Sequence, residues 1–282
     1  MDWERDDGIE SSNGGTFGRL CDYPIVYQGQ YVSKHLPDSI KSMNGFPFFY
    51  VLEAFRSGKT VDRLFVLDGC QDGPVKTILR EAKKQDTMVQ YVKKERLDQL
   101  SETKNHQGVI AYCAACEYAE VSDILENAKK KGEAPFIVLL DGIEDPHNLG
   151  AIIRTANQAG AHGVIIPKRR AVGLTATVAR TSAGAVNYTP VAKVTNLVTV
   201  MEDLKKEGMW FVCADMDGEE MYSLNLKGPI GLVIGNEGEG VSRLVKEHCD
   251  MVASIPMKGD IDSLNASVAM GVLAYEIVRQ RR

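Results

Sequence analysis

The spacing of apolar positions predicts a small layered α/β unit in the first half of the chain. Short apolar runs that read as strands alternate with segments of helical period, and Pro74 falls in the first turn of one helix. The predicted helices cover residues 50–56, 74–84 and 93–100, and the predicted strands cover 64–67, 88–92 and 108–112. This alternating order implies strands and helices packed in layers.

The second half of the chain predicts a parallel sheet covered by helices. Residues 136–140 form an uninterrupted apolar run, as a strand of a buried parallel sheet requires. Further strands are expected at 164–166, 210–214, 230–234 and 252–255, and helices at 149–159, 175–181, 197–207, 242–248 and 264–279. The expected fold class is therefore α/β in both halves.

The chain divides into four predicted segments. Residues 1–44 lack a sustained period of 2 or 3.6 and are expected to form a disordered extension, with a short strand at 23–27 as the alternative. Residues 45–117 form the first domain, and 134–282 form the second. Between them, residues 118–133 are polar and helical and end in three lysines and a glycine, which indicates a connector.

Composition places the chain among ordinary globular proteins. Its 282 residues include 33 basic and 38 acidic side chains, for a net charge of −5, with 44% hydrophobic and 25% charged residues. These values exclude collagen-like and wholly disordered chains. The chain has no run of about 18 apolar residues, no secretory signal in MDWERDDGIE, and too few cysteines, six, for a disulfide framework. We therefore expect a cytoplasmic protein with reduced thiols, which can still carry a local basic groove.

Polar residues gather just after the first buried strand of the second domain. Open α/β sheets place their sites at the carboxyl ends of strands. Four such residues follow this strand: Asp145, His147, Asn148 and Arg154. A plain helix entry, with Asp145 and Asn148 as caps, is the alternative. Asn148 and Arg154 are separated by six residues, or about 600° of helix, so they converge only if Asn148 precedes the regular helix.

Two further strand ends lead into unusual loops. Residues 235–240 read GNEGEG, a spacing that differs from the dinucleotide-binding GxGxxG and has no P-loop lysine. Glycine permits close approach of a ligand to the backbone, although a purely structural turn explains the same residues. Residues 254–269 pass from a strand that ends at Pro256 into a helix for which Ser263 and Asn265 are plausible N-caps.

Together the three segments resemble the SpoU/TrmH family of RNA ribose 2′-O-methyltransferases, in the SPOUT superfamily. The first family motif matches residues 145–156, where DPHNLG is followed by RTA. The second matches LVIGNEGEG at 232–240, and the third matches IPM at 255–257 with SLNASVA at 263–269. The resemblance implies a deep trefoil knot in the parallel-sheet domain, a feature otherwise nearly absent from proteins.

The first domain resembles the substrate-binding domain of one subgroup, the bacterial enzymes that methylate a guanosine ribose in the peptidyl-transferase region of large-subunit ribosomal RNA. VLEAFRSG at 51–58 and QGV at 107–109 carry this resemblance. GFPFFY at 45–50 replaces the family's Gly-Arg-Asn-type entry and lacks its basic residue. The implied partner is ribosomal RNA, with neither DNA nor a membrane. The alternatives are a transfer RNA methyltransferase and a non-catalytic RNA-binding assembly factor.

The resemblance also implies a cofactor and a set of site residues. S-adenosylmethionine is the implied cofactor, without a metal ion, and it is bound largely through backbone groups of Gly235, Ile255 and Leu264. The implied acceptor site contains Asn148, Arg154, Glu237, Ser263 and Asn265. Because a guanidinium with a pKa above about 12 is a poor base, we favour Arg154 as a cation that binds phosphate and stabilises developing alkoxide. Glu237 would orient Arg154 or relay the proton.

Other features favour plainer interpretations. Cys113 and Cys116 form a CxxC that lacks the second pair of a zinc site and the helix N-terminus of a thioredoxin-type site, so we expect incidental core cysteines. For His147 we favour a structural or substrate-edge role over that of a base. The basic runs at 168–170 and 279–282 either contact RNA phosphates or are solvated. A redox enzyme is the weakest alternative, since GxGxxG is absent.

The family resemblance further implies a homodimer in which motif helices form the interface. The helix expected at 264–279 offers small and apolar side chains for that role: Ala266, Ala269 and Gly271, and Val268, Val272 and Tyr275. An ordinary core helix explains the same pattern.

Overall fold

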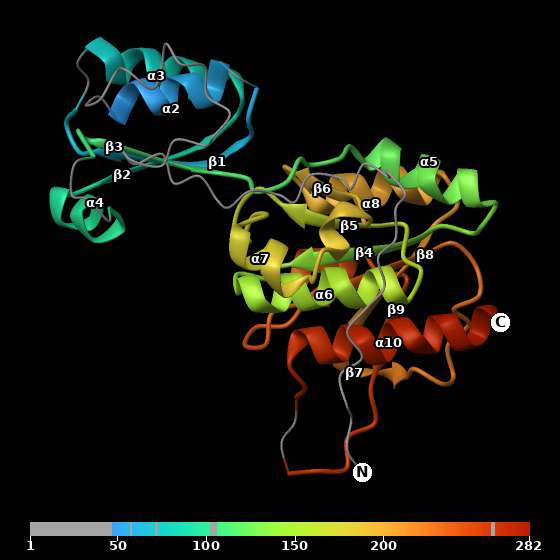
Figure 1. The fold of residues 1–282 in the computed structure, drawn as a ribbon. Helices are drawn as coiled ribbons and strands as arrows, with labels where there is room; N and C mark the ends of the chain where they lie inside the picture. Colours follow the sequence, from blue (N-terminus) through green and yellow to red (C-terminus); the bar gives the residue numbers. More distant parts are fainter. Residues whose placement is uncertain (1–46, 57, 71–72, 102–105, 261–262) are drawn as a thin grey trace, which may run out of the picture.

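The computed structural model describes residues 47–282, apart from 57, 71–72, 102–105 and 261–262. The extension predicted at 1–44, and its alternative strand at 23–27, lie outside the described residues. The described chain folds into two α/β domains joined by a connector (Figure 1). No helix of the described part is long and apolar enough to cross a membrane.

The first domain is a three-stranded sheet with helices on both faces. Its strands are β1 (Val61–Leu67), β2 (Met88–Val92) and β3 (Val109–Cys113), and its helices are α2 (Pro47–Arg56), α3 (Gly73–Lys84) and α4 (Lys94–Leu100). The strand order is β2-β1-β3, with β1 parallel to β2 and antiparallel to β3. Leu64 packs with α2 and α3 on one face, whereas Phe65 packs with Leu97 of α4 on the other, as alternation along a strand requires.

The connector contains a helix that belongs to the second domain by its packing. α5 (Val121–Lys131) begins with a capping box between Glu120 and Asp123 and ends at Gly132 in the left-handed conformation. Its buried Ile124 lies in one core with the second sheet. Gly163 leaves room for this contact, since a Cβ there would lie 2.5 Å from Ile124. Residues 118–133 are therefore more than a spacer.

The second domain contains the expected parallel sheet, which confirms the predicted fold class. Its strands are β4 (Phe136–Asp141), β5 (Gly163–Pro167), β6 (Val191–Val194), β7 (Trp210–Glu220), β8 (Ile230–Gly235) and β9 (Met251–Ser254). Their order is β6-β5-β4-β8-β7-β9, and every pair of neighbours is parallel. The trefoil knot implied by the family stays a prediction.

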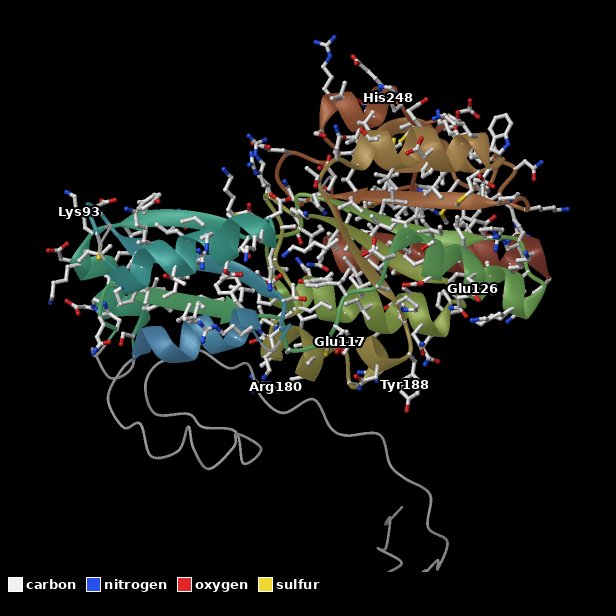
Figure 2. The ribbon with its side chains drawn as sticks, turned by 90° about the horizontal axis from the view of Figure 1, so that it is seen from above. Lys93, Glu117, Glu126, Arg180, Tyr188 and His248 are labelled. Atoms are coloured by element: carbon white, nitrogen blue, oxygen red, sulfur yellow. The ribbon has the colours of Figure 1, made fainter. Side chains whose placement is uncertain are left out.

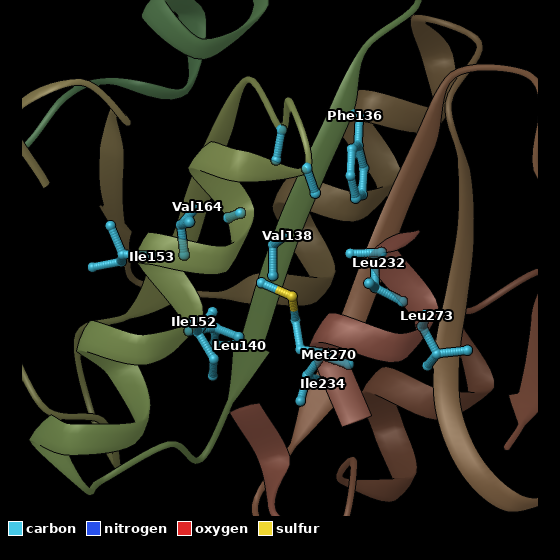
Figure 3. Packing of buried hydrophobic residues seen from close by; sticks show 14 of the residues in the cluster. Phe136, Val138, Leu140, Ile152, Ile153, Val164, Leu232, Ile234, Met270 and Leu273 are labelled. Carbon is cyan, nitrogen blue, oxygen red and sulfur yellow. The ribbon is translucent and has the colours of Figure 1, made fainter. Parts of the chain in front are cut away.

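Helices cover both faces of this sheet. They are α6 (Pro146–Gln158), α7 (Ala176–Thr181), the short 3₁₀ helix η1 (Ala185–Asn187), α8 (Leu197–Lys206), α9 (Arg243–Glu247) and α10 (Ala266–Arg281). On one face, Val138 and Leu140 of β4 pack against Ile152 of α6 and Met270 of α10 (Figure 3). On the opposite face, Ile137 and Leu139 pack in a second core with residues of α5, α8 and α9.

Two strands differ from the sequence prediction. β6 was not expected, because it has only four residues and follows the turn that contains Pro190. β7 was expected to end at residue 214 but continues to Glu220. It pairs with β9 at 212–214 and again at 219–220, and residues 215–218 bulge out between the two stretches. At the bulge Gly218 approaches β9 so closely that a Cβ would lie 2.5 Å from the Val252 carbonyl oxygen.

Candidate active site at the strand ends

The first strand-end segment forms a capped helix. Asp145 is the N-cap of α6, as the alternative of a plain helix entry expected, whereas Asn148 is not a cap; the Asp145 side chain accepts a hydrogen bond from the His147 N–H at 3.0 Å. Pro146 occupies the first helical position, where no N–H is needed. Asn148 follows inside the helix rather than before it, and only 8% of its surface is exposed. The cap therefore turns Asn148 toward the interior at the carboxyl end of β4.

Asn148, Glu237 and Asn265 form one hydrogen-bonded cluster, although they come from α6, the turn after β8 and the cap of α10. The Asn148 amide donates to Glu237 Oε1 at 2.5 Å, and the Asn265 amide donates to Asn148 Oδ1 at 2.8 Å. Asn265 also donates to Glu237 Oε1 at 3.1 Å. These bonds fix the orientation of both amide groups.

Asn265 is also the N-cap of α10, as the sequence predicted. Its Oδ1 accepts from the Ser267 N–H at 3.0 Å and from the Ser267 hydroxyl at 2.5 Å. The Ala266 N–H donates to Glu237 Oε1 at 3.4 Å, so this single oxygen receives three donors. Glu237 Oε2 accepts no hydrogen bond from any described residue. The cluster thus holds one carboxylate oxygen and leaves the other without a hydrogen-bond donor among the described residues.

The turn after β8 brings two backbone segments into direct contact. A Cβ on Gly235 would lie 2.0 Å from the Gly240 carbonyl carbon and 2.2 Å from the Val241 nitrogen. Asn236 Oδ1 closes the turn by accepting from the Gly238 N–H at 2.9 Å and the Glu239 N–H at 2.7 Å. Only glycine fits at 235, because the atoms that would be displaced belong to the backbone.

A cavity of about 620 Å³ lies beside this cluster. Four segments line it: the β7 bulge, the β8 turn, the end of β9 and the beginning of α10. Five residues singled out from the sequence contribute to its wall: Gly235, Glu237, Ile255, Ser263 and Leu264. The size is typical of a site for a small organic ligand.

The structure places Arg154 apart from this cavity. Arg154 lies on α6, is exposed, and makes no hydrogen bond or ion pair with any described residue. The sequence argument required Asn148 to precede the helix if the two side chains were to converge, and the structure shows Asn148 within it. In a single chain, Arg154 and Asn148 therefore point to different sides of α6.

The β7 bulge supplies cavity residues that the sequence reasoning missed, namely Asp215, Met216 and Asp217, with Glu220 at the end of the strand. The sequence could have indicated these residues, because they directly follow the carboxyl end of a predicted strand, where open α/β sheets place their sites. Burial alone would raise the pKa of Asp215, but hydrogen bonds from Lys246 and from the Asp217 N–H outweigh it and hold this pKa below its usual value. The Asp215 carboxylate is thus ionised and held in place by these hydrogen bonds.

The charge of the lining favours a cationic ligand. Five carboxylates line the cavity, Asp215, Asp217, Glu220, Glu237 and Glu239. Asp215 is paired with Lys246, which is not part of the lining, and the described lining contains no lysine or arginine. A sulfonium or an ammonium group is stabilised by such surroundings. Apolar surface from Ile255 and Leu264 and the backbone of Gly235, which lines the cavity, complete a site that fits S-adenosylmethionine in size and charge.

The remaining sequence candidates lie elsewhere. Cys113 ends β3 and is buried, which raises the pKa of its thiol to about 12, and the next helix begins only at Val121. This geometry does not favour a reactive thiolate. Across the described residues, no group of His, Cys, Asp and Glu side chains could hold a metal ion. Lys168, at the end of β5, forms an exposed ion pair with Asp86 of the first domain at 2.6 Å.

The fold and the cavity define a two-domain α/β protein with a small-ligand site at the carboxyl ends of parallel strands. Comparison with known families makes this specific. The model of the SpoU rRNA Methylase family matches residues 135–275, and the RNA 2′-O ribose methyltransferase substrate-binding model matches 48–119. The chain belongs to the SpoU family. It is therefore an RNA ribose methyltransferase, and its cofactor is S-adenosylmethionine.

Curated relatives extend this match over most of the chain. YacO of Bacillus subtilis, whose name assigns it to the TrmH family of tRNA/rRNA methyltransferases, is 48% identical over 233 residues, which cover 82% of this chain and 93% of YacO. A protein of Staphylococcus haemolyticus, named for the same family, is 45% identical over 232 residues, with the same shares of both chains. Both domains are thus included in the similarity.

Solved structures share the fold. The SpoU methyltransferase AviRb of Streptomyces viridochromogenes, in complex with the cofactor AdoMet, has a TM-score of 0.53 and 26% identity, covering 83% of this chain and 87% of AviRb. An AdoMet-bound rRNA methyltransferase of Sinorhizobium meliloti also has a TM-score of 0.53 and 26% identity, covering 83% of this chain and 85% of its own.

Proposed function

We propose that this enzyme methylates the 2′-hydroxyl of a guanosine ribose in large-subunit ribosomal RNA. The observation that carries the proposal is the Asn148–Glu237–Asn265 cluster, which holds a half-free carboxylate at the edge of the cavity. The substrate-binding match over 48–119 and the similarity to the Sinorhizobium meliloti rRNA methyltransferase support RNA of ribosomal origin. The cytoplasm, where this RNA is made in bacteria, is the proposed location.

The cofactor supplies a sulfonium-activated methyl group, so the protein has mainly to position the ribose and to handle the proton of its hydroxyl. Gly235, Ile255 and Leu264 would hold the cofactor, and the carboxylates of the lining would face its positive charge. Glu237 Oε2 would accept the hydroxyl proton. The three donors on Oε1 fix the direction in which Oε2 points.

Asn148 and Asn265 act through Glu237 in this scheme. Each amide donates to Glu237 Oε1, and their mutual hydrogen bond prevents either from rotating. Ser263 lies on the cavity wall two residues before Asn265, where its hydroxyl is exposed and available to the ribose. In this scheme the two asparagines contact Glu237 directly, and Ser263 would contact the ribose of a bound nucleotide.

Arg154 would bind an RNA phosphate and stabilise the developing alkoxide. Because it lies outside the cavity of its own chain, we propose that the acceptor site is completed in a homodimer. Val268 and Tyr275 of α10 are 49% and 50% exposed, so this helix offers apolar surface to a second copy. A C₂ arrangement would use the same helix face in both copies.

Transfer RNA is the second candidate substrate, because the names of the Bacillus and Staphylococcus relatives include both tRNA and rRNA. Mapping of 2′-O-methylation in the RNA of cells that lack this protein separates the two. We expect the loss of one methylated guanosine in large-subunit ribosomal RNA. Its return on expression of the wild-type chain, and not of Glu237→Gln, would connect the modification to this site. A loss of methylation confined to transfer RNA would show that transfer RNA, and not ribosomal RNA, is the substrate.

A further inference from the structure

A partly buried ionic cluster joins the two domains. Asp62 lies on β1 of the first domain, Lys193 on β6 of the second, and Tyr118 in the connector between them. Asp62 and Lys193 form an ion pair with their side chains only 12% and 14% exposed. The Tyr118 hydroxyl donates to Asp62 Oδ1 at 3.0 Å, and Lys193 Nζ lies 5.1 Å from the centre of the Tyr118 ring.

The loop between β5 and α7 closes tightly over this cluster. Gly173 is the reason it can, since a Cβ there would lie 2.3 Å from Asp62 Oδ2 and 2.8 Å from the Tyr118 hydroxyl oxygen. The Leu174 N–H donates to that hydroxyl at 2.8 Å, and the Leu174 carbonyl accepts from the Ala115 N–H at 2.6 Å. Leu174 thereby bonds the loop both to Tyr118 of the connector and to Ala115 at the end of the first domain.

The same loop also reaches the segment that carries the active site. The Val172 N–H donates to the Ile143 carbonyl at 2.9 Å, and Ile143 stands two residues before Asp145, the cap of α6. A short path of contacts therefore leads from β1 of the substrate-binding domain to the helix of Asn148. Figure 2 shows Glu117, the residue before Tyr118, at the junction of the two domains.

We propose that Asp62, Tyr118 and Lys193 are positioning residues that fix the substrate-binding domain relative to the methyltransferase domain, so that RNA bound to the first is presented at a set distance from the cavity. Domains joined by a connector move relative to one another unless the interface prevents it. Separation here would break the Asp62–Lys193 ion pair and the hydrogen bonds that the Tyr118 hydroxyl makes to Asp62 and Leu174. The inference rests on RNA methylation by the family and is independent of which RNA is the substrate.

Lys193→Met and Tyr118→Phe test the cluster in the full-length protein. Methionine keeps the apolar stem of the lysine and removes its charge, and phenylalanine keeps the ring and removes the acceptor of the Leu174 N–H. The matched control is Lys205→Met, which breaks an ion pair with Asp250 that is 26% and 24% exposed and lies within the second domain. All three variants replace a side chain by one of similar shape.

Four measurements distinguish positioning from a general loss of structure. Small-angle X-ray scattering should show a broader distribution of interatomic distances for Lys193→Met, and hydrogen exchange at Leu174 should accelerate in Tyr118→Phe. The KM for RNA should rise about tenfold to a hundredfold in Lys193→Met, because a small misplacement of substrate is costly. Affinity for S-adenosylmethionine, measured by calorimetry, should stay within about twofold, since neither Lys193 nor Tyr118 lines the cavity. Lys205→Met should match the wild type in all four.

Unchanged scattering and an unchanged KM for RNA in Lys193→Met would overturn the proposal. If Lys193→Met does not fold, the double variant Asp62→Asn/Lys193→Met takes its place, because it removes both charges of the pair. The same measurements apply to the double variant, with the same expected results. Scattering and hydrogen exchange require no RNA, so they decide the role of the cluster even if the proposed ribosomal substrate is wrong.

Discussion

Gly235 is the residue at which the backbone leaves no room for a side chain, because Gly240 and Val241 occupy the space a Cβ would take. We predict that Gly235→Ala weakens S-adenosylmethionine binding about tenfold to a hundredfold, the range expected when a methyl group is forced into packed backbone. Calorimetry on the folded variant measures the effect.

Gly238→Ala is the matched control in the same turn. The nearest atom to a Cβ at 238 is Asn236 Oδ1 at 3.6 Å, which is ordinary contact, and the φ angle there lies outside the left-handed region. Its affinity for the cofactor should equal that of the wild type. Equal weakening in both variants would mean that flexibility of the turn, and not close approach at Gly235, determines binding.

Arg154 is the second residue whose role can be separated from cofactor binding. We predict that Arg154→Ala lowers kcat about a hundredfold to a thousandfold, as removal of a charge-stabilising donor does. Its affinity for S-adenosylmethionine should change less than about threefold, because Arg154 does not line the cavity.

Arg243→Ala provides the comparison for Arg154→Ala. The side chain of Arg243 is 91% exposed, and among the described residues its ion-pair partner is Glu247 on α9. Its removal should leave turnover unchanged, because an exposed pair contributes little. Near wild-type turnover of Arg154→Ala would remove Arg154 from the mechanism.

At the scale of helices and strands, the sequence predicted the elements that depend on hydrogen bonds between residues close together in the chain. The caps at Asp145 and Asn265 were readable because each accepts a hydrogen bond from an N–H two residues ahead. β6 was not readable, since four residues that include Lys193 acquire strand geometry only by pairing with β5. The bulge in β7 likewise depends on β9, which lies far along the chain.

The candidate site shows the same division. Sequence motifs indicated Asn148, Glu237 and Asn265, and the structure brings these three together. Their pairing could not be derived from spacing, because Asn148 and Asn265 are separated by 117 positions. Helical geometry correctly predicted that Arg154 and Asn148 converge only if Asn148 precedes the helix. The structure shows that the helix begins directly after the Asp145 cap, so Asn148 lies inside it and the two side chains do not converge.

His162 connects two strands and makes their stability depend on pH. It precedes β5 and is fully buried, and its Nδ1 accepts from the N–H of Phe136, the first residue of β4, at 3.0 Å. Nε2 therefore carries the proton and faces Glu133 at 3.1 Å. Burial lowers the pKa of His162 from 6.5, and nearby Lys131 lowers it further.

We predict that the free energy of unfolding decreases as the pH falls from 7.5 to 5.5. The unfolded chain binds the proton at about pH 6.5 and the folded chain only below that, so protonation favours unfolding over this range, by at most about 1.4 kcal/mol per pH unit for one group. Urea denaturation at both pH values measures the difference. In His162→Asn, whose amide oxygen can still accept from Phe136, the difference should shrink; an unchanged difference would assign it to other groups.

At the scale of the whole molecule, the hydrophobic pattern predicted two domains but not the contacts between them. The Asp62–Lys193 pair spans 131 positions and joins residues that lie in unremarkable strands when considered locally. α10 presents the opposite case. Met270, Leu273 and Ile277 are buried in its own core, whereas Val268 and Tyr275, seven residues apart and so on one face, stay exposed. An apolar face of this kind is expected to have a partner.

We predict that the protein is a homodimer that tightens with S-adenosylmethionine. The first turns of α10 line the cavity through Ala266 and Ala269, so a ligand bound there orders the helix that carries the exposed face. A ligand that binds the dimer better than the monomer shifts the equilibrium by mass action. Sedimentation at micromolar concentration, with and without cofactor, should show the shift. Tyr275→Asp should produce a monomer, whereas Tyr91→Asp, at a tyrosine 52% exposed in the first domain, should sediment like the wild type. A wild-type protein that is monomeric in both conditions and fully active would refute the dimer and, with it, a role for Arg154 across the interface.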